Sequence, residues 1–348
     1  MWTGSRSSLA GASGPSSISL AGMRQRRLGS SGLHVSRLGL GTWLWGLDTD
    51  EHEARDQLAA FAGAGGTLVD TSAGYGDGLS EQLLGSMLGV VVDRDDVVIA
   101  TKAGRVRRRP AGGGRHWDTS RAHLTRQLDA SLRRLGVDAV DLWQVHVWSD
   151  QAPWEETLSA LDSAVTAGKA HYVGVSNYTG WQTAAAAAWQ RALPGRAVLA
   201  STQIEYSLLN RDVEDEVLPA AEALGLGVLA YSPLAGGVLT GKYRAGVPAD
   251  SRGASPRLES VVAPYLDERG RSIVEAVSRA AEGLGLSPLE VALTWVRDRP
   301  AVTAPIVGAR TAAQLNGALG VEEVELPPQI MQALDEVSGF GSETDAPG

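Results

Sequence analysis

The stretch DEHEARDQLAAFAGAGGTLVDTSAGYGDG, residues 50–78, contains in order the three elements that decide the fold. Its first half is amphipathic at helical spacing, and the run TLVDT (67–71) that follows has the short, apolar character of a buried strand. The run reaches Asp70, and Tyr75 follows in a glycine-rich turn. The stretch therefore predicts a helix, a strand and a loop that together present an acid and a phenol.

The same alternation of helical segments and short apolar runs continues along the chain. The eight runs are SRLGLGTW (36–43), TLVDT (67–71), VVIATK (97–102), AVDLWQVH (139–146), HYVGVS (171–176), AVLASTQ (197–203), GVLAYS (227–232) and VTAPIVG (302–308). Parallel strands with crossover helices produce this order, and eight units in roughly 300 residues favour a closed barrel. An open doubly wound sheet is the alternative, but no run leads into the G-x-G-x-x-G turn of a dinucleotide site, and LGLG at 38–41 comes nearest. We predict a (β/α)8 TIM barrel with an N-terminal β-hairpin at RRLGSSGLHV (26–35) and extra C-terminal helices.

Composition and charge exclude several classes of function. The 348 residues are 43% hydrophobic and 20% charged, a globular balance, and no apolar run reaches the length of a membrane span. A net charge of −9 argues against a nucleic-acid binder, and the absence of cysteine excludes disulfides, thiolate metal sites and a cysteine nucleophile. We expect a disordered extension at 1–22, a single barrel over 23–340 and a disordered tail at 341–348, in a protein of the cytoplasm.

Polar residues end several of the predicted strands, which is where a barrel places its active site. Asp70, Lys102 and His146 each close a run, and Tyr75 lies on the loop after Asp70. A metal site would need more carboxylates or histidines at this rim, and Ser176 has no evident base for a hydrolytic triad. The four side chains are therefore the candidate catalytic group, with no metal.

These four side chains suit proton donation. A cation lowers the pKa of a nearby phenol, and Lys102 is the cation expected beside Tyr75. Asp70 would keep Lys102 charged, and His146 would polarise a carbonyl oxygen. The group lacks an electron source, so a hydride-donating cofactor is implied. Two other interpretations remain open: a structural ion pair of Asp70 and Lys102, and Lys102 as the Schiff-base amine of a barrel aldolase or isomerase.

The motifs around these residues resemble those of the aldo-keto reductase family. DTSAGYGDGLSEQLLG (70–85) is highly specific, and TKAG, DLWQVH, GVSN, YSPLAGGVLTGKY and VGARTAAQL follow in the family's order. The resemblance covers residues 26–337 and is strongest to the subgroup of bacterial reductases and potassium-channel β-subunits. It implies reduction of aldehydes or ketones to alcohols by NADPH, with Tyr75 as the general acid. The family's catalytic residues fall on Asp70, Tyr75, Lys102 and His146.

The resemblance also implies which residues bind NADPH. Gly41, Thr42 and Trp43 match the loop beside the nicotinamide ribose, and Tyr231 matches the aromatic residue that stacks on the nicotinamide ring. The other implied cofactor positions are Asp70, Ser176, Asn177, Gln203, Ser232, Pro233, Leu234, Ala235, Gly236, Lys242, Arg252, Gly308, Arg310 and Gln314. Arginines suit the phosphate that distinguishes NADPH from NADH, and the amides of a helix opening at Arg310 would add to that grip. Gly317 and Ala318 stand where the subgroup commonly has an acidic or amide pair, a departure that weakens the preference for NADPH over NADH.

The expected substrate is a small carbonyl compound. Trp45, Trp117 and Trp148 lie on rim loops and are predicted to line an apolar pocket. The basic segment RVRRRPAGGGR (105–115) is either a solvated loop or a cover over the mouth that favours anionic substrates, a role assigned to Arg107 and Arg108. The alternative to a reductase is a nicotinamide-sensing regulatory subunit with slow turnover. His146 favours the reductase, since the channel β-subunits lack a histidine at that position. No nucleic-acid or membrane partner is expected, and no apolar stripe marks an oligomer interface.

Overall fold

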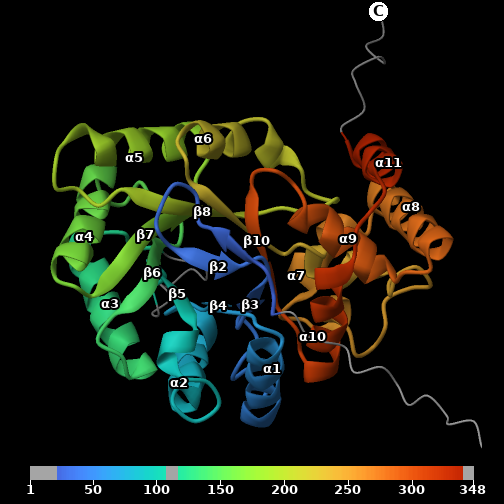
Figure 1. Ribbon diagram of the computed structural model, residues 1–348, viewed down its shortest axis with the longest axis horizontal. Coiled ribbons are helices and arrows are strands. Elements are labelled where there is room, and N and C mark those ends of the chain that lie inside the picture. Colours follow the sequence, from blue (N-terminus) through green and yellow to red (C-terminus); the bar gives the residue numbers. More distant parts are fainter. Residues whose placement is uncertain (1–21, 107–116, 340–348) are drawn as a thin grey trace, which may run out of the picture.

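The computed structural model describes residues 22–106 and 117–339, and its centre is a closed barrel of parallel strands (Figure 1). The eight barrel strands are β3 (Gly39–Gly41), β4 (Leu68–Asp70), β5 (Val98–Ala103), β6 (Val140–Val145), β7 (Ala170–Ser176), β8 (Leu199–Glu205), β9 (Gly227–Tyr231) and β10 (Val302–Val307). Each strand pairs with the next along the chain, and β10 also pairs with β3, which closes the sheet. Every predicted apolar run overlaps one of these strands, so the predicted barrel is confirmed.

Helices cover the outside of the barrel (Figure 1). They are α1 (Glu51–Gly63), α2 (Leu79–Met87), α3 (Arg121–Leu135), α4 (Trp154–Thr166), α5 (Gly180–Ala192), α6 (Val217–Ala223), α7 (Glu259–Val262), α8 (Glu268–Leu284), α9 (Pro288–Arg297), α10 (Ala312–Leu319) and α11 (Pro328–Ser338). Local sequence signals start several of them: the Asp50 carboxylate accepts from the Glu53 amide at α1, and Ser287 with Glu290 forms a capping box at α9. Packing of α1 against α10 closes the helical ring, and α8 and α11 lie side by side outside it, which confirms the extra helices.

A two-stranded hairpin closes the N-terminal end of the barrel. Its strands β1 (Gln25–Arg27) and β2 (His34–Ser36) are antiparallel, with Arg26 opposite Val35, as the sequence predicted. Leu28 and Val35 are fully buried in one cluster with side chains of the barrel strands: Leu68, Ala100, Leu142, Ala200, Leu229, Ala304 and Ile306. The hairpin therefore seals one end with apolar side chains, and the C-terminal end is left for a site.

The period of the strands decides which side chains reach the open end. Side chains two residues apart on a strand lie on the same face, so Asp70 shares the inner face with Leu68, and Lys102 shares it with Ala100. Asp70 is the last residue of β4, and Lys102 lies one residue before the end of β5. Both polar side chains therefore lie just above the apolar layer that fills the barrel.

Several expectations fall on residues that the structure does not describe. The predicted disordered segments 1–22, apart from Gly22, and 341–348 lie outside the described residues, and so do Arg107 and Arg108. In the parts of the chain that are described, no helix combines the length and the apolar character needed to cross a bilayer.

Candidate active site

The centre of the site is a buried ion pair between Lys102 and Asp70. The Lys102 Nζ lies 2.7 Å from both carboxylate oxygens of Asp70 and 2.9 Å from the carbonyl oxygen of Thr71. Burial lowers the pKa of Lys102, while the charge of Asp70 and its hydrogen bond oppose that shift. Because all three ammonium protons have acceptors and the residue is 1% exposed, the amine lies below the cavity floor. This geometry disfavours the Schiff-base interpretation of Lys102.

Tyr75 lies above this pair on the loop between β4 and α2. Its loop turns sharply because Gly76, Asp77 and Gly78 all have positive φ, so the chain reverses within one short 3-10 helix, Tyr75–Gly78. The Tyr75 ring centre lies 5.1 Å from the Lys102 Nζ. Among the described residues the Tyr75 hydroxyl has no hydrogen-bond partner, and the residue lines the cavity. A substrate oxygen is therefore the acceptor that this phenol lacks.

The expected direction of the Tyr75 pKa was wrong. Burial raises the pKa of the Tyr75 phenol well above its usual value, Asp70 adds to the rise, and the Arg105 guanidinium opposes it. Lys102 is not among the groups that lower the pKa of Tyr75. Its ammonium group is paired with Asp70 through two hydrogen bonds of 2.7 Å. The phenol is therefore held in its protonated form, which is the form that donates a proton.

His146 follows β6 and faces Tyr75 across the mouth. Its ring meets the rings of Tyr75 and Trp117 edge-on, with centres 6.0 Å and 5.4 Å apart. The Nδ1 atom lies 3.1 Å from the hydroxyl oxygen of Ser72, a residue of the same strand-end loop as Tyr75. The contact with Ser72 occupies Nδ1 and so fixes the orientation of the ring at the mouth.

A cavity of about 1020 Å³ opens at the C-terminal rim of the barrel. Nineteen of the predicted site residues line it: Gly41, Trp43, Asp70, Tyr75, Trp117, His146, Ser176, Asn177, Gln203, Tyr231, Ser232, Pro233, Leu234, Gly236, Lys242, Arg252, Gly308, Arg310 and Gln314. These residues come from the ends of all eight barrel strands or the segments that follow them, so closure of the barrel brings together residues from across the whole sequence.

One end of this cavity gathers three cations. They are Lys242, Arg252 and Arg310. Burial lowers the pKa of Lys242 and of Arg252, the charge of Arg310 lowers both further, and the charge of Arg252 also lowers that of Lys242. Arg252 donates to the Gly308 carbonyl oxygen at 3.3 Å, and Lys242 forms no ion pair within the described residues. Like charges held together at a half-buried surface favour an anionic ligand such as a phosphate.

The predicted contribution of helix amides at Arg310 needs correction. The helix α10 begins at Ala312, whose amide donates to the Glu53 carboxylate at 2.7 Å, and the Gln314 amide is capped by the Thr311 hydroxyl. Two first-turn amides are therefore already used inside the protein. The grip on an anion here comes from the side chains.

A group of amides and hydroxyls lies between the cations and the catalytic residues. The Gln203 Nε2 donates to Asp70 Oδ1 at 2.8 Å, which links this group to the ion pair. The Asn177 amide nitrogen donates to the His146 carbonyl oxygen at 3.0 Å, and the Tyr231 hydroxyl donates to Asn177 Oδ1 at 2.8 Å. These bonds fix the Tyr231 ring at the cavity wall, where a flat ligand ring could stack on it.

Four predicted binding residues do not line the cavity. Thr42 is buried and bonds the Ser80 hydroxyl at 2.6 Å, and Ala235 is buried within its loop. Trp45 is fully buried, with its indole nitrogen 3.0 Å from Gln57 Oε1. Trp148 stacks on Trp154 with ring centres 6.3 Å apart, in an aromatic cluster on the outer side of the rim. Of the three predicted tryptophans, only Trp117 lines the cavity, so the assignment of Trp45 and Trp148 to its lining is wrong.

The structure adds residues that the motifs did not single out. Arg105 lines the cavity beside Tyr75, and Glu205 does so with its carboxylate 2.8 Å from the Tyr265 hydroxyl. Burial raises the pKa of Glu205. Glu81, which is fully buried, accepts from Thr101 at 2.6 Å and from Arg134 at 2.8 Å, and its charge supports protonation of Lys102. Its place in DTSAGYGDGLSEQLLG is the signal that could have revealed it.

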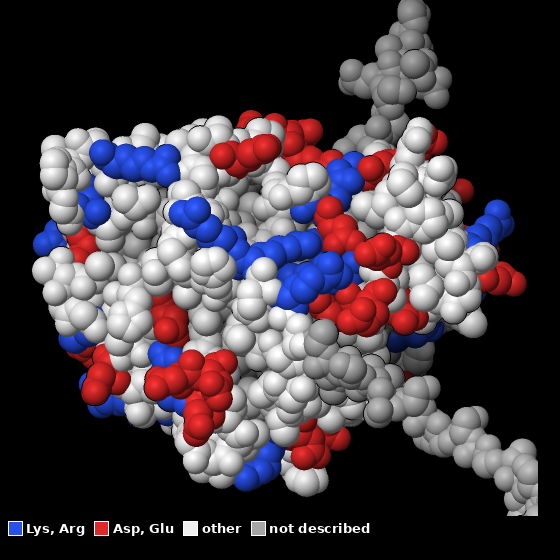
Figure 2. Space-filling model, viewed as in Figure 1, with Lys and Arg blue, Asp and Glu red and all other residues white. Residues whose placement is uncertain are grey.

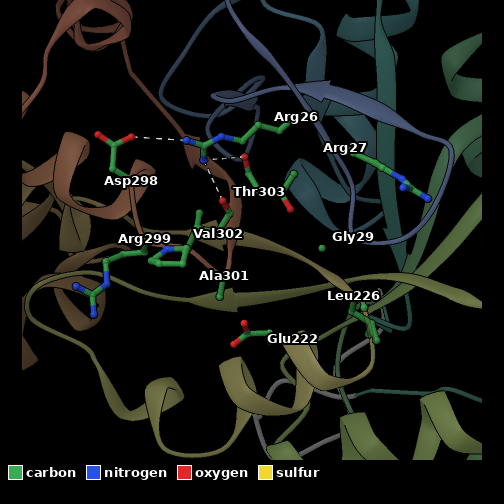
Figure 3. A pocket seen from close by; sticks show the side chains of 13 residues that line it. Arg26, Arg27, Gly29, Glu222, Leu226, Asp298, Arg299, Ala301, Val302 and Thr303 are labelled. Carbon is green, nitrogen blue, oxygen red and sulfur yellow. Dashed lines mark hydrogen bonds and ion pairs between the residues drawn. The ribbon is translucent and has the colours of Figure 1, made fainter.

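A second hollow, of about 560 Å³, lies at the opposite, N-terminal face of the barrel (Figure 3). Figure 2 shows Lys and Arg side chains in a band over this face with acidic side chains beside them. Arg26 points toward the Val302 carbonyl oxygen, 2.9 Å away, and toward the Asp298 carboxylate, 3.6 Å away (Figure 3). The three arginines that line this hollow, Arg26, Arg27 and Arg299, are already bonded within the fold, so the rim cavity is the candidate active site.

A closed barrel with an ion-paired lysine, a protonated phenol and an imidazole at its C-terminal rim defines a barrel oxidoreductase. The sequence matches the Aldo/keto reductase family over residues 37–338, and the chain belongs to that family. The resemblance seen in the motifs is thereby confirmed, and the chain is an oxidoreductase enzyme of this family.

Similar proteins cover nearly the whole chain. It is 38% identical to the uncharacterized oxidoreductase YrpG of Bacillus subtilis, over 92% of this chain and 98% of that protein. It is 34% identical to a probable voltage-gated potassium channel subunit beta of Oryza sativa, over 90% of this chain and 96% of the other. It is also 34% identical to the L-glyceraldehyde 3-phosphate reductase of Escherichia coli K12, over 84% of this chain and 86% of that enzyme.

Proposed function

We propose that this protein reduces aldehydes or ketones to alcohols with NADPH, and that Tyr75 is the general acid. One observation carries the proposal: a protonated phenol, with no hydrogen-bond partner among residues 22–106 and 117–339, lies at one end of a cavity whose other end gathers three cations. The first feature suits protonation of an oxygen, and the second suits the phosphates of a nicotinamide dinucleotide. The relative named for reducing L-glyceraldehyde 3-phosphate supports an aldehyde as the substrate class.

The residues present fit this cofactor. Lys242, Arg252 and Arg310 would hold its phosphates, because their mutual repulsion is relieved by an anion. Tyr231 would stack on the nicotinamide, and Gln203 and its neighbouring amide and hydroxyl groups would bind the carboxamide. When bound, the reduced nicotinamide supplies a hydride to the carbonyl carbon.

The chain's own residues then handle the proton. Tyr75 donates its hydroxyl proton to the carbonyl oxygen as negative charge develops there, and His146 Nε2 donates a hydrogen bond to the same oxygen. Lys102, 5.1 Å from the phenol ring, and Arg105 place positive charge near the phenolate that results. The Asp70 carboxylate keeps Lys102 in place by accepting a hydrogen bond from its ammonium group. Gln203 in turn donates to the same carboxylate and holds it in position.

We infer a preference for NADPH over NADH from the two arginines. Arg252 and Arg310 offer planar, fixed donors that match a phosphate monoester. Gly317 and Ala318 lie on the helix behind them and offer no side-chain donor to adenine. The preference therefore rests on phosphate recognition. A cytoplasmic enzyme with no nucleic-acid or membrane partner is the setting we propose.

A regulatory subunit that senses nicotinamide is the second candidate, because one similar protein is named a channel β-subunit. The contact of His146 with Ser72, 3.1 Å at Nδ1, supports turnover, since it orients an imidazole toward the mouth. Tight NADPH binding without turnover on any aldehyde would favour the regulatory role.

The test is loss of NADPH absorbance with an activated aromatic aldehyde, compared between wild type, Tyr75→Phe and Tyr172→Phe. Removing the general acid should lower kcat by about 10²–10⁴-fold. Tyr172 lies on β7 in the apolar cluster near the hairpin, so the same chemical change there should leave kcat within about twofold. NADPH affinity, measured by fluorescence, should be unchanged in both variants. Full activity in Tyr75→Phe would overturn the assignment of the proton donor.

A further inference from the structure

Arg105 is positioned by the fold at the reaction end of the cavity. It comes three residues after Lys102, and its backbone is held by Gln127 of α3. Gln127 Oε1 accepts from the Gly104 amide at 2.6 Å, and Gln127 Nε2 donates to the Arg105 carbonyl oxygen at 2.6 Å. Residues 104 and 105 are therefore clamped from both sides by one side chain.

The side chain of Arg105 is fixed as well. Its Nη1 donates to the Gly74 carbonyl oxygen at 2.7 Å, and its stem passes directly over Gly74. A Cβ atom at position 74 would lie 2.7 Å from the Arg105 Cδ, so the close approach requires glycine there. The half-buried guanidinium thus lines the cavity next to Tyr75, which directly follows Gly74.

No acid of the described chain neutralises this guanidinium. Arg105 forms no ion pair in the described ranges, and within them its guanidinium donates only to a neutral carbonyl oxygen, that of Gly74. Its charge acts on the catalytic phenol, where it lowers the pKa of Tyr75 against the effect of burial. It is separate from the three cations that the proposed function assigns to the cofactor, because the electrostatic neighbours of Lys242 and Arg252 do not include it.

We propose that Arg105 binds an anionic group of the substrate, so that the preferred substrates are carbonyl compounds that carry a carboxylate or a phosphate. A guanidinium with donors to spare pairs with either anion through two parallel hydrogen bonds. The anionic group takes no part in the reaction: hydride adds to the carbonyl carbon and the Tyr75 proton adds to the oxygen. The inference rests on the proposed function and names its substrate class.

The test compares anionic and neutral aldehydes of the same shape. The pairs are para-carboxybenzaldehyde with its methyl ester, and glycolaldehyde phosphate with glycolaldehyde. Because the Arg105 charge also acts on Tyr75, Arg105→Gln should lower kcat/KM for every aldehyde, but the loss should be roughly 10–100-fold greater for the anionic member of each pair than for the neutral member. Arg105→Lys should recover part of the loss, because it keeps the charge and loses the fork. The control is Arg133→Gln on the exposed face of α3, which makes the same change in net charge away from the cavity.

The outcomes separate this inference from the proposed function. A greater loss with the carboxylate or with the phosphate identifies which anion the site prefers, and either supports the inference. Equal losses of kcat/KM on anionic and neutral aldehydes would overturn the anion site but leave the proposed reductase function standing. A weaker NADPH affinity in Arg105→Gln, with no difference between the two kinds of aldehyde, would also overturn it. If wild type reduces no aldehyde, calorimetric titration with benzoate and benzamide decides: tighter binding of benzoate that is lost in Arg105→Gln supports the anion site, and equal binding overturns it.

Discussion

The arginines at the two ends of the barrel have opposite surroundings. At the N-terminal face, Arg26 contacts Asp298 (Figure 3). Arg297 also contacts Asp298, and Arg37 bonds Glu322 at 2.7 Å. At the C-terminal rim, Arg105 and Arg252 bond only backbone carbonyl oxygens among the described residues.

This difference shows which cations the fold uses for itself. A half-buried cation without a counter-charge costs stability, so it persists where a ligand supplies the missing charge. The N-terminal cations stabilise the closure of the barrel by the hairpin. At the rim, Arg105 and Arg252 are available to ligands, in agreement with the rule that barrel enzymes bind at the C-terminal face. Arg310 has only a loose ion pair, 3.9 Å from the exposed Asp250.

The largest expected effect follows from removing the acid of the catalytic ion pair. Asp70→Asn should leave Lys102 buried without a counter-charge, lower the free energy of unfolding by about 3–5 kcal/mol and reduce kcat by about 10²-fold or more. Asp129→Asn removes a partly exposed acid that pairs at 2.7 Å with Lys169, just before the start of β7 at the opposite end, so it should cost only about 1 kcal/mol and leave kcat unchanged. Denaturant unfolding and steady-state reduction measure both. Similar stability losses in the two variants would contradict the comparison.

Removing a rim cation should affect binding more than stability. Arg252→Gln should weaken the binding of NADPH by about 1.5–3 kcal/mol, or roughly 10–100-fold in Kd, because a charge-assisted hydrogen bond to phosphate is lost. The free energy of unfolding of this variant should stay the same or rise, because the repulsion of Arg252 from Arg310 and Lys242 is removed. Arg26→Gln removes a guanidinium that bonds the Val302 carbonyl oxygen, so it should lower the free energy of unfolding and leave the Kd for NADPH unchanged. Fluorescence titration and denaturant unfolding of each variant distinguish the two patterns, and a stability loss in Arg252→Gln without a change in Kd would be inconsistent with them.

A smaller effect is expected at Ser72, which we regard as a positioning residue for His146. Ser72→Ala removes a contact of 3.1 Å to Nδ1, so kcat should fall about fivefold, equivalent to about 1 kcal/mol. The pH profile of kcat should also shift, because nothing would then hold Nδ1 of His146 in one hydrogen-bonding role. The matched control is Ser278→Ala in α8, whose hydroxyl bonds the Val274 carbonyl at 2.8 Å. A pH profile identical to wild type would show that Ser72 serves packing alone.

The smallest effect is an expected absence of change with pH. Burial and Asp70 raise the pKa of Tyr75, so the phenol stays protonated and the single-turnover rate of reduction should vary less than twofold between about pH 7 and pH 9.5. A rate that falls across this range with one ionisation, and is flat in Tyr75→Phe, would show a lowered pKa instead. The same shift costs stability only above about pH 10, where the unfolded tyrosine ionises and the folded one does not.

Much of the fold and site could be predicted because the information is local. The period-2 apolar runs mark the strands, and a strand's last residues lie at the rim wherever the barrel closes, which is why Asp70, Lys102 and His146 were identifiable. The direction in which a loop side chain points is not local. Trp45 and Trp117 both follow strand ends, yet the Trp45 indole donates to Gln57 inside the protein and the Trp117 ring packs edge-on against His146 at the mouth of the cavity.

The sequence by itself determined the order of strands and helices, the end of the barrel at which a site is expected, and the four candidate catalytic side chains. Only the tertiary structure decided the pKa direction of Tyr75, the contact of Ser72 with His146, and the neighbours of each cation. Burial and pairing depend on residues such as Gly74 and Arg105, or Asp70 and Gln203, that are far apart along the chain. Spacing along one strand or helix carries no record of such contacts, because they form only when the barrel closes.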